Sequence, residues 1–484
     1  MAGRNSVLVL AAAILFFALP AKADLTISSK PTQNVSCSAG VCTATDKKAV
    51  LNVGELTAML GAGDVTVSTG GVAKDIEVSA GLSWASTSRL TLEADKSLIV
   101  KQPVTVAGSG ALTLSSNGGH QNVDLEFFGK GSVQFWDLSS SLVINGKSYT
   151  LVGDIATLAA DIAANPAGFY ALAKSYDASA DGTYSSSPIP TTFGGAFEGL
   201  GNEISNLRIS FSSDSRGVLI GLLMEVDHTG IVRNIGVADA DLEGVNPGVY
   251  GAVAPLVGLN AGFVDRSWSS ATLGIPGGEG AQPGGLVGDN QGTVSNSFAI
   301  VKLDIASILS NIGGLVGANE GIVYSSYSTG EIVTGLNNNA GGLVGVNSGA
   351  IDNAFATTSI HQKRRCCGGG NYGGIVGKND AAGQIADSYA AASINAKATD
   401  VFLGGLVGFD GAQSGGIIAS YWDLDLSISD PSQGAGNLAN DPGITGLTTG
   451  KLQSGLPAGF DPRIWGQRVN INDGFPYLFS IVGK

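Results

Sequence analysis

The chain has 484 residues, of which 72 are glycine and only 14% are charged, and its formal net charge is -14. Because 44% of the residues are hydrophobic, this composition excludes disorder driven by high charge and low hydrophobicity. It also argues against nucleic-acid binding, because contacts to phosphates need a basic surface. The length suits two or three ordinary domains or one long solenoid.

The first 23 residues have the pattern of a secretory signal peptide. Arg4 gives a positive start, residues 7–19 are apolar, and Ala21 and Ala23 frame a small-x-small cleavage site. We therefore predict cleavage after Ala23 and export of the rest of the chain to the cell surface or the medium, with the periplasm as an alternative. An uncleaved N-terminal anchor is the other interpretation of this segment.

Residues 24–152 alternate apolar and polar side chains between Gly, Asn and Asp turns, as in LTLEADKSLIV and SLVINGKSYTLV. This period of two predicts strands, here of a solenoid with a loose repeat. Near the start, Cys37 and Cys42 bracket the short loop CSAGVC, and in an exported chain such a pair predicts a local disulfide.

Residues 153–195 are predicted to contain one short helix and a linker. The segment DIATLAADIAAN has apolar residues at helical spacing, Asp154 can cap its start, and Pro166 follows its end. We expect this helix to connect two solenoid sections.

Residues 196–425 contain an internal repeat of about eight units of about 30 residues. The motif G-G-[LI]-V-G marks five of them, and it begins at Gly284, Gly313, Gly341, Gly373 and Gly404. Valine, isoleucine and regularly placed glycines favour short strands joined by turns. A unit this small cannot bury its own apolar face, whereas stacked units can. The pattern therefore predicts an all-β chain that forms a parallel β-helix (a β-solenoid).

Within the repeat, three kinds of residue recur in columns. The columns are aliphatic (Leu286, Leu315, Leu343), amide (Asn290, Asn319, Asn347) and aromatic (Phe298, Tyr327, Phe355). We expect the stacked amides to hydrogen-bond along the axis of the solenoid. A Val/Ile column lies four residues before the aromatic column, and this shared parity predicts that both face the core. The alternative is an outward aromatic platform for sugar rings or a partner. In the last unit the same offsets select Ile418 and Trp422.

The unit GGLVGANEGIVYSSYSTG and its siblings resemble the GLUG repeat, and the strand-rich part of residues 24–152 resembles filamentous-haemagglutinin-like bacterial surface proteins. Together the resemblance covers most of residues 50–425. It implies a β-helical exoprotein, often an adhesin. GLUG arrays also occur beside peptidase domains, but this chain has no HExxH motif, and its three histidines lie far apart in the sequence.

Three groups of residues are candidates for chemistry. The loop HQKRRCCGGGNY carries Lys363, Arg364 and Arg365, which could bind an acidic polysaccharide or a membrane surface, or could simply be exposed. The adjacent Cys366 and Cys367 are either free or link chains, and no zinc ligand set accompanies them.

Asp423 and Asp425, in YWDLDLS, are the candidate carboxylate pair of a polysaccharide lyase or glycosidase. After the last unit, residues 426–484 are expected to cap the open end of the stack.

From these observations we predict an adhesin-like or structural binding rod without catalysis, cofactor or metal. Its partner would be a surface ligand such as a glycan or a host or matrix protein, and not a nucleic acid; the involvement of an outer-membrane export partner is open. The alternatives are a polysaccharide-processing enzyme on the same fold and a periplasmic or matrix scaffold.

Overall fold

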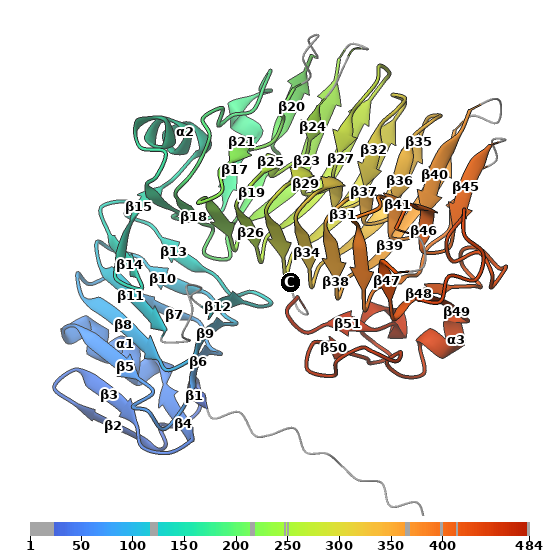
Figure 1. Cartoon of the computed structure of the whole chain (residues 1–484). Coiled ribbons are helices and arrows are strands. Elements are labelled where there is room, and N and C mark those ends of the chain that lie inside the picture. The colour runs from blue at the N-terminus through green and yellow to red at the C-terminus, as the bar shows by residue number, and fades with distance from the viewer. Residues whose placement is uncertain are drawn as a thin grey trace, which may run out of the picture.

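The computed structural model (Figure 1) describes residues 24–116, 124–212, 218–245, 248, 251–363, 368–396, 400–412 and 415–481. Within them the chain is a parallel β-solenoid, as predicted, because strands of successive coils pair side by side along the axis. The predicted signal peptide lies outside the described residues, and so do Arg364, Arg365, Cys366 and Cys367.

One sheet of 16 strands, which we call the long sheet, runs through the whole solenoid. Its pairs are parallel except β2–β3 and β14–β15. In order along the sheet its strands are β2 (Val35–Ser38), β3 (Val41–Ala44), β5 (Val65–Ser68), β8 (Arg89–Ala94), β11 (Ala111–Ser116), β14 (Ser141–Ile144), β15 (Lys147–Val152), β16 (Phe169–Leu172), β18 (Ala196–Glu198), β22 (Ile231–Arg233), β26 (Phe263–Asp265), β30 (Thr293–Ser295), β34 (Ile322–Tyr324), β38 (Ala350–Asp352), β42 (Gln384–Ala386) and β47 (Ile417–Ile418).

The N-terminal section has two further sheets. They comprise β4 (Lys48–Asn52), β1 (Asp24–Ser28), β6 (Asp75–Val78), β9 (Ser97–Val100) and β12 (Asp124–Phe127), and, separately, β7 (Leu82–Trp84), β10 (Val104–Val106) and β13 (Val133–Phe135). Alternate residues of these strands point inward and form one hydrophobic cluster from Leu25 to Leu200.

The repeat section has two further main sheets. The wide sheet comprises β17 (Tyr176–Asp177), β19 (Glu203–Ser205), β23 (Gly236–Gly244), β27 (Trp268–Ile275), β31 (Phe298–Ile305), β35 (Tyr327–Thr334), β39 (Phe355–Gln362), β43 (Tyr389–Ala390), β48 (Ser420–Asp423) and β49 (Ile444–Leu447), with β20 (Arg208–Phe211) and β44 (Ile394–Asn395) beside this path. The amide sheet comprises β21 (Leu223–Val226), β25 (Val257–Asn260), β29 (Val287–Asn290), β33 (Val316–Asn319), β37 (Val344–Asn347), β41 (Val376–Asn379) and β46 (Val407–Asp410).

Short strands before the amide sheet complete the coils of the repeat section. They are β24 (Ala252–Val253) and β28 (Gln282–Pro283), which pair together, and β32 (Asn311–Gly313), β36 (Asn339–Gly341), β40 (Gly370–Gly373) and β45 (Val401–Gly404). The turn that follows brings backbones very close. A Cβ atom on Gly313 would lie 1.8 Å from the carbonyl oxygen of Val316, and one on Gly317 would lie 2.6 Å from the backbone of Gln282. The glycines of the motif are therefore required by the tight turn itself and by the packing of coil on coil.

Three α-helices accompany the strands of the described residues. The predicted helix is α2 (Ile155–Ala164), which is capped by Asp154 through a 2.7 Å hydrogen bond from the N–H of Thr157. It does not lead into a free linker, because β16 follows it and joins the long sheet. An unpredicted helix, α1 (Val53–Ala62), is capped by Asn52, and α3 (Thr449–Leu452) is a single turn.

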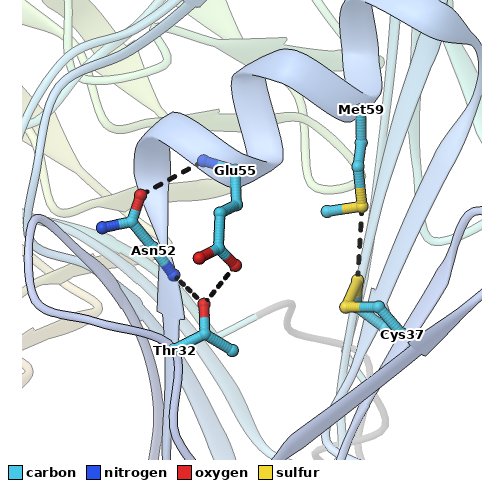
Figure 2. The surroundings of a disulfide bond; sticks show 6 residues. Thr32, Cys37, Asn52, Glu55 and Met59 are labelled. Carbon is cyan, nitrogen blue, oxygen red and sulfur yellow. Dashed lines mark hydrogen bonds between the residues drawn. A yellow bond between two sulfur atoms is a disulfide. The ribbon is translucent and has the colours of Figure 1, made fainter.

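A disulfide and α1 close the N-terminal end of the solenoid. Cys37 and Cys42 are bonded across the β2–β3 hairpin, with their Cα atoms 4.1 Å apart. The sulfur of Cys42 is buried 3.9 Å from the Sδ of Met59 on α1 (Figure 2). At the start of the same helix, Thr32 donates a 2.6 Å hydrogen bond to the carboxylate of Glu55.

The amide column forms a continuous ladder inside the repeat section. Each asparagine is buried and donates from Nδ2 to the Oδ1 of the equivalent residue in the next coil. The distances are 2.7 Å for Asn260 to Asn290, for Asn290 to Asn319 and for Asn319 to Asn347, and 2.9 Å for Asn347 to Asn379 and for Asn379 to Asp410. Because Asp410 comes last, it needs only to accept, and a carboxylate can do so.

The alternating burial of β34 gives a direct test of the core. Val323 is fully buried, whereas its neighbour Ile322 is 47% exposed on the opposite face. We expect Val323→Asp to lower the free energy of unfolding by more than about 3 kcal/mol, because it buries an unpaired charge. Ile322→Asp, as the matched control, should cost less than about 0.5 kcal/mol. Circular dichroism melts that are equal for the two variants would contradict the inward assignment of this face.

The end of the amide ladder gives a pH-dependent test. Burial raises the pKa of Asp410 above its ordinary value, against a lowering by the hydrogen bond from Asn379. A group whose pKa is raised in the folded state contributes its full stability below its unfolded-state pKa. That contribution is lost as the pH rises through the folded-state pKa. Asp410→Asn should therefore raise the melting temperature at pH 7, and this gain should vanish at about pH 3.

Within the ladder, a carboxylate in place of an amide is expected to lower the stability of the fold. Asn347→Asp removes the proton that Asn347 donates to Asn379, and leaves two oxygens facing each other. We expect it to destabilise the fold at pH 7 by about 1–3 kcal/mol. If Asp410→Asn and Asn347→Asp both raise or both lower the melting temperature at pH 7, each amide does not donate toward the next coil as described.

Candidate functional site

The aromatic column lies on the outside of the solenoid, contrary to the expectation that it fills the core. Its rings belong to a cluster separate from the core of the repeat section. In β31, Ala299, Val301 and Leu303 point into the core, so Phe298 points the other way together with Ile300.

A corner in each coil explains why the parity argument failed. The residue two before the aromatic ring has a left-handed backbone, with φ of 49° at Asn296, 50° at Ser325 and 52° at Asn353. Such a residue turns the chain, so the alternation of faces does not continue from the Val/Ile column into the next strand. The signal in the sequence was the Asn, Ser or Asp that most units carry at this position.

The aromatic rings stack along the outer surface in nearly parallel planes. Ring centroids are 5.8 Å apart for Trp268 and Phe298, 5.0 Å for Phe298 and Tyr327, 4.6 Å for Tyr327 and Phe355, and 5.2 Å for Phe355 and Tyr389. We call this row the aromatic stack.

The last unit is shifted by one residue from the sequence alignment. Ile417 pairs with Ile385, and Tyr421 pairs with Tyr389. Ile418, which was aligned with the core column, is 63% exposed, and Trp422 lies in the core. Both assignments for this unit are therefore corrected by one position.

The C-terminal segment covers one end of the aromatic stack and does more than cap the axis. Residues 433–447 add a further partial coil, in which β49 pairs with β48. The chain then folds back along the side of the solenoid, below β38 and β48 in Figure 1. Trp465 donates a 2.7 Å hydrogen bond to Asn353, and Tyr389 donates one of 2.7 Å to the carbonyl of Pro476. Phe460 and Phe475 add further ring contacts.

Beyond the aromatic stack, the outer face of the wide sheet is open and polar. It carries a shallow groove of about 580 Å³ over β23, β27 and β31, which we call the lateral groove. The groove is lined by Asp239, Asp241, Ser270, Thr272, Ile300 and Lys302. Its outward residues mix acid, hydroxyl, apolar and basic side chains, so it offers contacts to a polar ligand rather than to an apolar one.

Of the three basic residues in the predicted loop, the described residues include only Lys363. Its ammonium group pairs with both carboxylate oxygens of Asp304, at 2.7 Å to Oδ2, and both side chains are about half exposed. An exposed pair of this kind contributes little stability, so Lys363 can exchange Asp304 for a ligand at low cost.

The proposed carboxylate pair has structural partners. Asp423 is fully buried and accepts hydrogen bonds of 2.9 and 2.8 Å from the hydroxyl of Thr449 and of 2.9 Å from the N–H of Asp425. Asp425 is exposed and accepts a 2.9 Å hydrogen bond from the N–H of Thr449. Both carboxylates therefore fasten α3 to the end of β48.

Among the described residues, no group of three or more His, Cys, Asp or Glu side chains is placed to hold a metal ion. None of the helices in the same part of the chain is long and apolar enough to cross a bilayer. No protein-family model matches the sequence, and no curated protein matches it either.

The structural role of Asp423 can be tested against that of its neighbour. Asp423→Asn should cost about 1–3 kcal/mol, because it replaces one acceptor oxygen of a buried, hydrogen-bonded carboxylate by an amide donor. Asp425→Asn, at an exposed position, should change stability by less than about 0.5 kcal/mol. Urea unfolding gives both values, and hydrogen exchange should show faster exchange near Thr449 only in the first variant. Equal effects of the two would contradict this assignment.

Proposed function

We propose that the chain is an exported bacterial repeat protein that acts as an adhesin-like or structural binding rod. The observation that carries this proposal is the open outer face of the wide sheet, with its lateral groove, on a solenoid whose interior is filled by side chains. A rod of this kind presents the same face over several coils, which suits a long or repetitive ligand.

The ligand that we propose is a surface polysaccharide. The lateral groove combines hydroxyl groups and carboxylates with the exposed Lys302, and Lys363 lies on the same side of the solenoid beside Asp304 of β31. Hydroxyl-rich chains can bond to such a mixture without the strong charge that a nucleic acid would require. The resemblance to GLUG-repeat and haemagglutinin-like exoproteins supports the same class of function.

Retention on immobilised polysaccharides, together with the size of the polysaccharide chains, tests this proposal. We expect the full chain, purified after export, to be retained on at least one acidic or neutral polysaccharide without shortening it. Lys302→Glu and Lys363→Glu should weaken retention at least about fivefold, because each removes an ammonium donor from the proposed face and, for an acidic polysaccharide, adds a repelling charge.

The matched control is Lys378→Glu. Lys378 is a lysine of the amide sheet, on another face, whose side chain is 39% exposed and pairs with Asp380. Its substitution should leave retention unchanged. Shortening of the polysaccharide would contradict a role without catalysis, and equal losses in all three variants would contradict the assignment of the face.

A further inference from the structure

The outer face of the wide sheet carries a row of charged residues that runs along the axis of the solenoid. The row takes one residue from each of five successive strands, β20, β23, β27, β31 and β35, and pairing in register places these residues side by side. We call it the charge row, and its members in order are Arg208, Asp241, Thr272, Lys302 and Glu331. The signs along it are therefore plus, minus, neutral, plus and minus.

The charges of this row have few partners within the chain. The side chains of Arg208, Asp241 and Lys302 are exposed, and none of them forms an ion pair with another described residue. Glu331 is about half exposed, and its nearest cationic group in the same part of the chain is the ring of His361, at 3.8 Å. All four charges are thus available to opposite charges on a second molecule.

The order of the signs makes the charge row complementary to its own reverse. Two copies can face each other with antiparallel solenoid axes and a two-fold axis that passes through Thr272. Each coil then meets the coil that lies equally far on the other side of this axis. Arg208 lies opposite Glu331 of the second copy, and Asp241 lies opposite Lys302 of the second copy. Every charge of the row is matched by one of opposite sign.

Other arrangements of the same two faces bring like charges together. A shift of one coil in one direction places Arg208 opposite Lys302, and a shift in the other direction places Asp241 opposite Glu331. A shift of two coils places Asp241 or Lys302 opposite its own copy. With a two-fold axis along the solenoid, every charge would meet its own copy. Because like charges opposite each other are unfavourable, the charge row favours a single register.

The residues beside the charge row are compatible with this register. Glu243 would lie opposite Asp304 of the second copy, but the carboxylate of Asp304 already binds the ammonium group of Lys363. That ammonium group would lie between the two carboxylates and can pair with both. The lateral groove lies over β23, β27 and β31, so the two lateral grooves would face each other across the two-fold axis. Hydroxyl groups such as that of Ser270 would meet there through water, which is common in polar interfaces.

We propose that the outer face of the wide sheet binds a second copy of this chain and forms an antiparallel, two-fold symmetric dimer. Five coils about 4.8 Å apart, with strands of eight residues at about 3.3 Å each, cover roughly 600 Å² of each copy. This area lies at the lower limit for a specific interface, so we expect a weak dimer with a dissociation constant in the micromolar range. The dimer would cover the lateral groove, so a second copy and a polysaccharide would compete for this face. The inference does not depend on polysaccharide binding.

Sedimentation equilibrium of the full chain, purified after export and measured without polysaccharide, tests the dimer. We expect a monomer–dimer equilibrium whose dissociation constant rises at least tenfold between about 0.05 M and about 0.5 M salt, because the contacts are charged. Asp241→Lys and Lys302→Glu should each abolish the dimer, since each places like charges opposite each other. Lys378→Glu, on another face, should dimerise as the wild type does. A wild type that stays monomeric at millimolar concentration, or a dimer that survives either of the first two substitutions, would overturn the proposal.

A mixture of the two monomeric variants tests the register itself. In a mixed dimer, the lysine introduced at position 241 of one copy faces the glutamate introduced at position 302 of the other. The unchanged Lys302 and Asp241 also face each other, so every contact is again between opposite charges. We therefore expect the mixture to dimerise with a dissociation constant within about tenfold of the wild-type value, with unchanged circular dichroism spectra. A mixture that remains monomeric would overturn the proposal.

Discussion

In-register stacking of parallel coils is the constraint on which the rest of the repeat section depends. Each residue has the equivalent residue of the next coil as its neighbour, as when Val294 pairs with Val323 and Val323 with Ile351. A column can therefore hold only side chains that tolerate copies of themselves. Amides, aromatic rings and aliphatic groups do so, whereas like charges at this spacing repel. This explains the low share of charged residues and the mixture of signs on the wide sheet, where Asp241, Thr272, Lys302 and Glu331 follow one another in register.

The same rule makes the ends of each column exceptional, because the last member lacks one neighbour. Asn260 begins the amide ladder with an unpartnered Oδ1, and Asp410 ends it with a group that only accepts. The aromatic stack ends at Trp268, which borders a small pocket next to Phe127, and at the other end it lies under the C-terminal segment. Interior positions thus satisfy one another, whereas the end positions need other partners.

The sequence was sufficient to predict the β-solenoid, the amide ladder and α2, because each depends on local spacing or capping. It could not give the direction of the aromatic column, since the corner at Asn296 breaks the alternation of faces that the argument assumed. Helix α1 was missed because Gly54 and Gly61 weaken its helical pattern. Phe127 and Trp268 line one small pocket although they are 141 positions apart in the sequence, and no local pattern predicts such a contact.

The way in which the C-terminal segment folds back has a consequence for how the protein can change length over evolution. Its contacts reach back to Asn353 and, through Ser480, to Ser325. Duplication or loss of a unit between Ser325 and the C-terminal segment would move one partner of these contacts by a whole coil. The contacts of the C-terminal segment with Asn353 and Ser325 would then be lost. A unit duplicated between Trp268 and Ser325 would extend the amide ladder and the aromatic stack without disturbing either end. Related chains should therefore vary in the number of units at this internal position, and the length of the solenoid should change in steps of one whole coil.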